Sequence, residues 1–315
     1  MNFARLVSIL TVVSFTLSVG AQSRPDEKRL RISQMITETP TTFLNVFRIG
    51  TQKNQLGKWG LVLGTTVPLL IYDEDIYNET QKIGRRWGLS TEDKLKPYMK
   101  ITEDFALMWG PSDLSSGLYF LGDGWIHLSA ASAFLAVGYF GDHTRPFNTA
   151  VELFNGFLCS TIFSQALKKS FGREAPAVRE SPGGTWRHFP SWADYEREKT
   201  RHDAFPSGHV MTTTVTFTIL RGNYPEWESW LWPTQLVYTA ALGFGMVNNG
   251  IHWAGDYPLG IALGYFFGKA ALQMARTGAD ESAEAAQATA LLDPQLVPSF
   301  DALTGNPVAS LRWDF

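Results

Sequence analysis

The fold depends most on residues 207–219, which read SGHVMTTTVTFTI. β-Branched residues alternate along this stretch, so that propensity alone would assign it to a strand. Its first residue favours a helix instead, because Ser207 can accept a hydrogen bond from the free backbone N–H groups of a first helical turn. A helix that begins there also presents its positive end to an anion near Gly208 and His209. We therefore predict a helix over this stretch.

Apolar segments lie on both sides of the predicted helix. Segments that carry almost no charge include 59–72 before it and, in the core, 125–141, 147–167, 229–251 and 257–275. Of the core segments, two precede the predicted helix, 125–141 and 147–167. These two are predicted to be helices that are buried nearly all round. In the last segment, Gly260, Gly264 and Gly268 would form one stripe on a helix and let a neighbouring backbone approach closely. A polar loop at 176–206 interrupts the apolar segments.

Composition limits the classes of function. The chain has 315 residues, 44% of them hydrophobic, and a net charge of −3, so nucleic acid is not expected as a partner. The mean hydropathy of −0.09 is low for a chain made mostly of membrane spans. Residues 125–141 and 229–251 are long enough, or nearly so, to span a bilayer. Buried helices of a soluble bundle have the same composition, and between these alternatives we favour membrane association.

The N-terminus has the pattern of a secretory signal. One cation, an apolar run at 6–20 and a small residue at the break predict a signal peptide at 1–21 and an exported protein, periplasmic or membrane-associated, with its site outside the cytoplasm. Cys159 is the only cysteine and is predicted to be buried and inert. The expected regions are an N-terminal helical region at 22–123, a core bundle at 124–276 and an irregular, mobile or loosely docked tail at 277–315.

Two histidines stand in sequence contexts suited to phosphoryl transfer. A histidine nucleophile needs one bare ring nitrogen, which requires a partner that holds the proton on the other. His252 has such a partner in Asp256, four residues later, where the following Tyr-Pro pair indicates a helix start. A second histidine must protonate the leaving oxygen, and His209 directly follows the turn at Ser207 and Gly208. Taken alone, each of these motifs is more often structural.

Together and in order, these residues resemble the type 2 phosphatidic acid phosphatase and vanadium haloperoxidase family. Its pattern is K-x6-R-P, then P-S-G-H, then S-R-x5-H-x3-D. Lys168 opens the first motif, Pro206 to His209 complete the second, and His252 and Asp256 keep the third. The resemblance implies an all-α, multi-helix bundle. It also implies that His252 is the nucleophile of a phosphohistidine intermediate, that Asp256 orients it and that His209 is the general acid.

The resemblance further implies that Lys168 and the backbone around Ser207 and Gly208 bind phosphoryl oxygens. Two arginines of the family pattern are missing, because Ala175 and Met246 stand in their places. Charge-assisted hydrogen bonds contribute about 1.5–3 kcal/mol each, so their loss weakens the anion site. Arg173 is our candidate replacement among the phosphate ligands, although it is about as well explained by pairing with Glu174. Restoring arginine at positions 175 and 246 is expected to raise turnover.

Other charged residues of the loop at 176–206 are expected to form a solvated surface of mixed charge. The arginines concerned are Arg179, Arg187, Arg197 and Arg201. Three histidines without a partner pattern, His127, His143 and His188, are predicted to be structural.

We predict an exported phosphatase that acts on a phosphorylated lipid, which can be a lipid diphosphate, or on a small phosphate ester. The alternative is a catalytically weakened family member that binds an anion or a partner. Retention of both histidines, the aspartate and Lys168 favours the enzyme. A haloperoxidase is less favoured, because vanadate binding needs the arginines that are missing. No metal or cofactor is expected, since the sequence has no cluster of metal ligands and a phosphohistidine mechanism needs none.

Overall fold

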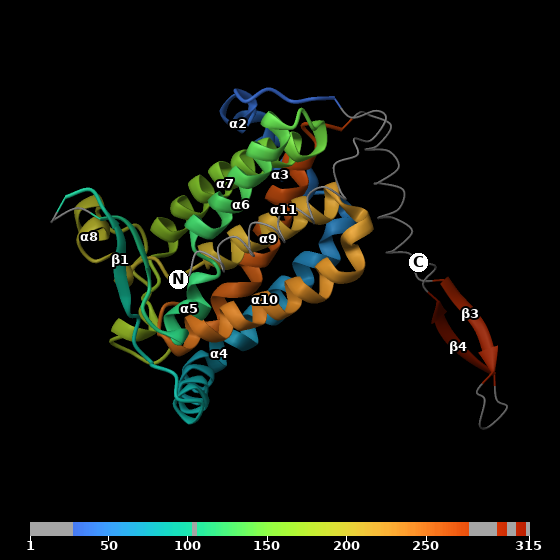
Figure 1. The fold of residues 1–315 in the computed structure, drawn as a ribbon. Helices are drawn as coiled ribbons and strands as arrows, with labels where there is room; N and C mark the ends of the chain where they lie inside the picture. The colour runs from blue at the N-terminus through green and yellow to red at the C-terminus, as the bar shows by residue number, and fades with distance from the viewer. Residues whose placement is uncertain (1–27, 103–105, 277–294, 301–306, 313–315) are drawn as a thin grey trace.

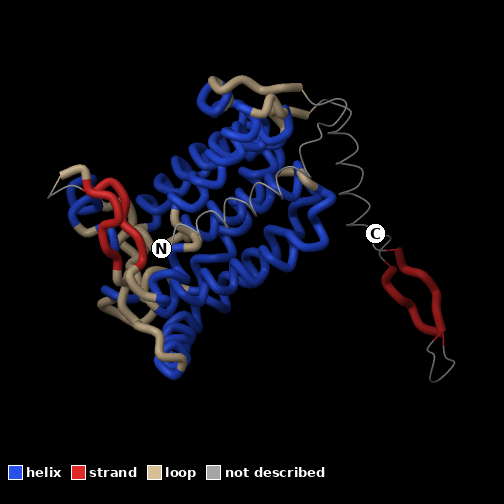
Figure 2. Tube along the Cα trace, in the orientation of Figure 1, coloured by secondary structure: helices blue, strands red, loops and turns tan. Residues whose placement is uncertain are grey.

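Helices dominate the structure, a computed structural model that describes residues 28–102, 106–276, 295–300 and 307–312 (Figures 1 and 2). They pack side by side as a bundle, which confirms the predicted all-α class. The predicted signal peptide at 1–21 lies outside the described residues.

The elements occupy the following residues. The helices are α2 (Gln34–Thr37), α3 (Thr39–Gly50), α4 (Leu56–Arg86), α5 (Leu114–Phe120), α6 (Gly124–Phe140), α7 (Thr144–Phe171), α8 (Trp192–Arg197), α9 (Gly208–Asn223), α10 (Glu228–Asn248) and α11 (Tyr257–Leu272). Short 3-10 turns are η1 (Lys53–Gln55), η2 (Pro176–Val178), η3 (Lys199–Arg201), η4 (Pro225–Trp227) and η5 (Ala254–Asp256). The strands are β1 (Leu95–Lys100), β2 (Ala106–Pro111), β3 (Gln295–Phe300) and β4 (Pro307–Arg312).

The centre of the bundle is the contact between α9 and α11. The predicted glycine stripe lies in it: a Cβ added at Gly264 would lie 2.5 Å from the carbonyl oxygen of Met211. At Gly260 an added Cβ would lie 2.8 Å from the carbonyl oxygen of Ser207, at the very start of α9. The missing side chains therefore let α11 approach α9 at backbone distance and fix the first turn of α9. The predicted helix at 207–219 is confirmed, since tertiary packing overrides its β propensity.

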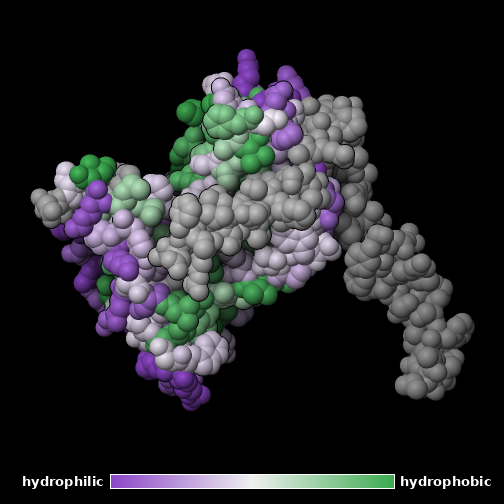
Figure 3. Space-filling model, viewed as in Figure 1, coloured by the Kyte–Doolittle hydropathy of each residue, from purple (hydrophilic) through white to green (hydrophobic). Residues whose placement is uncertain are grey.

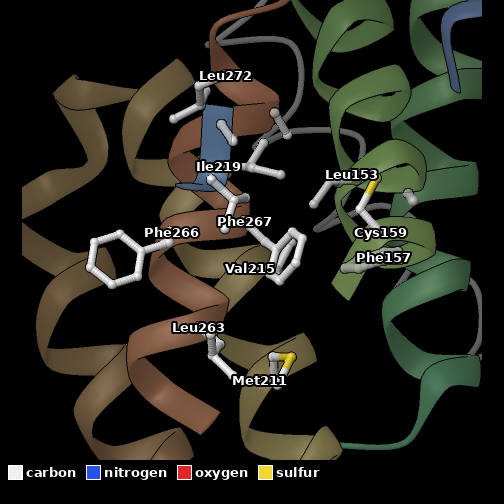
Figure 4. Packing of buried hydrophobic residues seen from close by; sticks show 14 of the residues in the cluster. Leu153, Phe157, Cys159, Met211, Val215, Ile219, Leu263, Phe266, Phe267 and Leu272 are labelled. Atoms are coloured by element: carbon white, nitrogen blue, oxygen red, sulfur yellow. The ribbon is translucent and has the colours of Figure 1, made fainter. Parts of the chain in front are cut away.

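Apolar side chains from α7, α9 and α11 fill the space around this contact (Figure 4). Leu153 of α7, Val215 of α9 and Phe267 of α11 are each 0% exposed. Cys159 lies in the same cluster, as predicted, and burial raises the pKa of its thiol to about 11. Residues of α3 join the cluster, so the segment before residue 124 packs on the core.

Helices α6 and α7 differ sharply in burial, although both were predicted to be buried nearly all round. Helix α7 is deeply buried over most of its length. Helix α6 buries only one face, and its aromatic residues Trp125, Tyr139 and Phe140 are 41%, 58% and 85% exposed. The prediction is therefore wrong for α6, because an apolar composition does not reveal how many neighbours a helix has.

Helix α4 buries polar side chains and exposes apolar ones, which is the reverse of the usual pattern. Its buried residues are Thr66, Asp73, Tyr77 and Gly84. Its outer face carries Leu61, Leu63, Val67 and Ile71, which are between 53% and 70% exposed. Among the described residues, length and composition would let no helix cross a membrane alone, whereas α5 and α6, bent by 55° at their junction, pass that test as a pair.

Two antiparallel hairpins complete the described structure. Strands β1 and β2 pair with each other at one end of the bundle, where β2 contacts α5 (Figure 1). Strands β3 and β4 pair from Gln295↔Arg312 to Phe300↔Pro307, in a tail that was predicted to be irregular. Each strand contains a proline, Pro298 in β3 and Pro307 in β4. Both strands of a two-stranded ladder are edge strands, however, where a missing N–H is tolerated.

Candidate active site

Two histidine side chains meet at one end of the bundle. His209 lies in the first turn of α9, and His252 lies in the connection between α10 and α11. Their ring centroids are 5.7 Å apart, with the ring planes inclined at 73°. His252 is 2% exposed, whereas His209 is partly exposed. The fold thus brings together the two histidines that the motifs identify.

The first turns of α9 and α11 hold this arrangement in place. Ser207 caps α9, and its hydroxyl accepts a hydrogen bond from the backbone N–H of Val210 at 3.4 Å. The backbone N–H of Ser207 donates to the carbonyl oxygen of Asp256 at 3.0 Å, just before α11 begins. Because each histidine is close to one of these residues in sequence, this bond fixes the two rings relative to each other.

Two acceptors face the Nδ1 atom of His252. The carbonyl oxygen of Ala204 is 2.7 Å away, and Oδ2 of Asp256 is 3.4 Å away. A carbonyl oxygen only accepts, so Nδ1 carries a proton, and in the neutral ring Nε2 then carries none. The shorter of the two contacts comes from the main chain. The hydrogen bond of Nδ1 therefore goes to Ala204, and Asp256, the orienting residue expected from the sequence, lies at ion-pair distance from the same atom.

Asp256 is held by donors on both of its oxygens. Its side chain is 0% exposed. Oδ2 accepts from the backbone N–H of Trp253 at 2.8 Å, and Oδ1 accepts from Nη1 of Arg173 at 2.6 Å. The carboxylate is thus fixed beside His252 by one donor from its own loop, Trp253, and one from Arg173.

Arg173 does not have the position expected of a phosphate ligand. Its guanidinium is 1% exposed and lies between Asp256 and Asp73, with Nη2 donating to Asp73 Oδ2 at 2.7 Å. Nη2 also donates to the carbonyl oxygen of Gly183 at 2.8 Å. Because two buried carboxylates take up its charge, Arg173 does not replace the missing arginines. The prediction of a phosphate-binding role for Arg173 is corrected accordingly.

A small polar cradle lies at the start of α9. A Cβ added at Gly208 would lie 3.8 Å from Nζ of Lys168 and 3.5 Å from Oγ of Ser164, one helical turn earlier on α7. Lys168 is 7% exposed and its Nζ lies 3.7 Å from Asp203 Oδ2. Ser164 is 4% exposed, and its hydroxyl has no hydrogen-bond partner among the described residues. The cradle therefore offers an ammonium group and an unpaired hydroxyl beside free N–H groups of a first helical turn.

The positions of the two missing arginines are buried in apolar surroundings. Ala175 is 3% exposed and belongs to a cluster with Tyr77 and Trp253. Met246 is 0% exposed, and the hydroxyl of Ser207 donates to its Sδ atom at 3.9 Å. Neither position has room prepared for a guanidinium.

The loop arginines form the mixed-charge surface that the sequence predicts. Each pairs with a nearby carboxylate: Arg179 with Glu74, Arg187 with Glu180, Arg197 with Asp194, and Arg201 with Glu198 and Glu180. His127 is buried between the hydroxyls of Thr213 and Thr216, as expected of a structural histidine.

Burial determines the protonation of His209. It lowers the pKa of this ring well below its ordinary value, and His252 and Lys168 lower it further. His209 is therefore neutral near pH 7 in the free protein. An anion bound beside it would raise this pKa and produce the protonated form that a general acid requires. The ring of Tyr119 packs edge-on against His209, with centroids 5.5 Å apart.

The sequence did not lead us to three components of the site, which are Asp73, Ser164 and the carbonyl of Ala204. Asp73 does have a signal, because it lies at helical spacing from Thr66 and Tyr77, on one face of α4. Ser164 is four residues before Lys168, which puts both on one face of α7. No side-chain pattern marks a main-chain acceptor.

Comparisons with known proteins bear on the family. No curated protein matches the chain. A solved structure with a partial likeness is that of a transmembrane PAP2-type phosphatidylglycerolphosphate phosphatase from Bacillus subtilis. Sequence identity to it is 15%, the comparison covers 79% of this chain and 97% of that one, and the TM-score is 0.41. The family model of the PAP2 superfamily matches residues 149–279, the part of the chain that contains the three motifs. These residues are therefore similar to the PAP2 superfamily, as the motifs within them indicate.

Proposed function

We propose that the protein is an exported phosphatase, which hydrolyses a phosphomonoester or a lipid phosphate or diphosphate through a phosphohistidine at His252. One observation carries the proposal: Nδ1 of His252 donates to Ala204 at 2.7 Å, which leaves Nε2 bare in a ring that faces His209. A bare imidazole nitrogen beside a second imidazole supplies a nucleophile and a proton donor in one place.

The reaction has two steps. In the first, Nε2 of His252 attacks phosphorus, the bond from phosphorus to the ester oxygen breaks, and protonated His209 gives its proton to the leaving oxygen. In the second, His209 takes a proton from water as the water oxygen attacks the phosphohistidine. The bond from phosphorus to Nε2 then breaks, which releases phosphate and restores both rings. Asp256 stabilises the positive charge that His252 acquires in between.

Binding of the phosphoryl group is assigned to the cradle at the start of α9. Lys168 supplies the positive charge, and the first N–H groups of α9, at Gly208 and its neighbours, supply directed donors. The hydroxyl of Ser164 is free to donate to the same group. Ser207 contributes by holding the first turn of α9 in place, because its hydroxyl caps the helix and its backbone N–H donates to the carbonyl oxygen of Asp256.

A lipid substrate is supported by the outer surface of the helices. The exposed leucine, valine and isoleucine side chains of α4 leave an apolar face without a neighbour among the described residues. On α10, Leu236 and Val237 are 52% and 71% exposed. In Figure 3, apolar patches lie along the sides of the bundle, while hydrophilic residues gather around α8 and β1. We infer that these faces contact a lipid surface, which brings the site to a membrane-bound phosphate.

A second candidate function is favoured by the two missing arginines. Ala175 and Met246 lie in apolar clusters, and Arg173 is committed to two carboxylates. A site with one ammonium group stabilises the charge of a phosphoryl transition state less well than a site with three cations. Such a protein would bind an anion without hydrolysing it efficiently.

Turnover and covalent trapping separate the two functions. Purified wild-type protein, His252→Ala and the exposed control His188→Ala are incubated with an aryl phosphate and with a short-chain phosphatidic acid. We expect turnover and an acid-labile phosphohistidine in the wild type and the control, and neither in His252→Ala. Equal turnover in all three proteins would exclude His252 as the nucleophile. Phosphate binding without turnover in any of them would support the anion-binding alternative.

A further inference from the structure

An ion triad is buried directly behind His252. The guanidinium of Arg173 bridges two carboxylates, Asp256 at 2.6 Å and Asp73 at 2.7 Å. Exposure of the side chains is 1% for the arginine and 0% for both carboxylates. One positive and two negative groups leave the triad with a net negative charge. This charge lies on the side of Asp256 that faces away from His252.

The triad is closely enclosed. The rings of Trp186 and Trp253 flank the guanidinium, whose central carbon is 5.0 and 5.2 Å from their centroids. Oδ1 of Asp73 accepts from the backbone N–H of Gly255 at 2.8 Å. Desolvation on this scale often outweighs the attraction between the charges, and apolar side chains of similar volume are commonly as stable. Stability alone is therefore a weak explanation for three buried charges.

The connection to His252 is short. Oδ1 of Asp256 binds Arg173, while Oδ2 of the same carboxylate lies 3.4 Å from Nδ1 of His252. An arginine that acted on Asp256 alone would draw the carboxylate and its negative charge away from the imidazole. Asp73 offsets that pull, because it takes the other arm of the same guanidinium.

We propose that Asp73 is a positioning residue for the nucleophile, which acts through Arg173 to hold the Asp256 carboxylate in place against His252. The proposal rests on the function proposed above for His252. Asp73 belongs to α4, outside the matched residues 149–279. The domain matched by the family model is thus incomplete without a carboxylate from the N-terminal part of the chain.

The next residue of α4 provides a matched control. Glu74 also pairs with an arginine, Arg179, at 2.8 Å, but the two side chains are 24% and 28% exposed. Asp73→Asn and Glu74→Gln each remove one negative charge from the same helix with almost no change of volume. Of the two carboxylates, only Asp73 shares its arginine with Asp256, the carboxylate that contacts His252.

Nuclear magnetic resonance of the histidine rings tests the proposal without any need for turnover. The full-length protein is labelled with 15N-histidine, and the ring resonances of His252 are followed against pH in the wild type and both variants. In Asp73→Asn we expect the titration midpoint of His252 to fall by about one pH unit, a tenfold change in proton affinity. In Glu74→Gln we expect no measurable shift. An identical midpoint in all three proteins would overturn the proposal.

Steady-state kinetics with the aryl phosphate provide a second measurement. We expect Asp73→Asn to lower kcat about tenfold, or roughly 1.4 kcal/mol, with KM changed less than twofold, because Asp73 touches no substrate. If Asp73→Asn lowers kcat but leaves the titration midpoint of His252 unchanged, Asp73 has only a structural role. That result would also overturn the proposal. An inactive wild type whose His252 midpoint still depends on Asp73 would count against the proposed phosphatase function and leave the positioning contact standing.

Arg173→Lys serves where Asp73→Asn does not fold. Lysine keeps the charge between the carboxylates but not the two-armed geometry, so Asp256 should lose part of its fixed position. We expect an intermediate shift of the His252 resonances in this variant. Resonances that coincide with those of the wild type would show that the triad does not act on His252.

Discussion

Ala175 and Met246 stand where the family pattern has two arginines, so the candidate site lacks two of the positive charges in that pattern. Both are buried, Ala175 against Tyr77 and Trp253, and Met246 against Tyr119 and Val210. The proposed anion site therefore has Lys168 as its ammonium donor, and Arg173 instead pairs with Asp256, the carboxylate beside His252.

This packing reverses the expectation that restoring the two arginines raises turnover. In Ala175→Arg with Met246→Arg, two guanidinium groups would enter apolar clusters without carboxylate partners, which costs several kcal/mol each. We expect a lower melting temperature and no gain in turnover of an aryl phosphate, measured beside Met246→Leu. The leucine variant conserves volume and should cost less than about 1.5 kcal/mol. A folded double-arginine variant that is faster than wild type would contradict this account.

At the scale of elements, the α9–α11 contact places the machinery. The start of α9 carries His209, and the residues just before α11 carry His252 and Asp256. Three glycines of α11 bring the two helices to backbone contact, and one of them touches the residue that caps α9. The distance between the two histidine rings is thus set by helix packing and not by either motif.

Alanine substitutions on two helices test this packing. In Gly264→Ala the new Cβ would lie 2.5 Å from the carbonyl oxygen of Met211, which cannot move without displacing α9. We expect the free energy of unfolding to fall by about 1–3 kcal/mol. Gly64→Ala is the matched change on α4, where nothing lies within 4 Å of the added Cβ. It should stabilise the helix by about 0.5–1 kcal/mol. The free energy of unfolding is measured with a denaturant. Equal changes in the two variants would contradict the close contact.

For the whole molecule, the buried polar groups of the core make stability depend on pH. His127 of α6 is enclosed by hydroxyls of α9, at 2.9 Å from Thr216 and 3.2 Å from Thr213. Burial lowers the pKa of His127 from 6.5 to about 4. Between these values the unfolded chain binds the proton and the folded chain does not, so acid favours unfolding.

The contribution of His127 is therefore fully present above pH 6.5 and is lost as the pH falls toward 4. We expect this histidine alone to cost about 3 kcal/mol of stability over that range. Chemical unfolding at pH 7 and pH 4 should show a smaller acid-induced loss in His127→Gln than in the wild type. The exposed control His188→Gln should lose as much as the wild type does. Equal losses in all three proteins would contradict a buried, neutral His127.

Much of the fold could be predicted from local patterns, because helix caps, glycine spacing and apolar periodicity are properties of neighbouring residues. Ser207 indicated the start of α9 against its β propensity, and Gly264 indicated a close helix contact. Exposure could not be predicted in this way. Helix α6 has the composition of a core helix, yet its outer face has no neighbour among the described residues.

The sequence by itself indicated the similarity to the PAP2 superfamily, the helical class and the two histidines, because each is encoded in short spacings that can be read without any knowledge of packing. Only the tertiary structure decided the electrostatics of the site. It assigned Arg173 to Asp73 and Asp256, surrounded Ala175 and Met246 with apolar side chains, and brought the carbonyl of Ala204 to His252. One of those contacts, between Asp73 and Arg173, joins residues 100 positions apart, and no local pattern records which side chains a fold brings together.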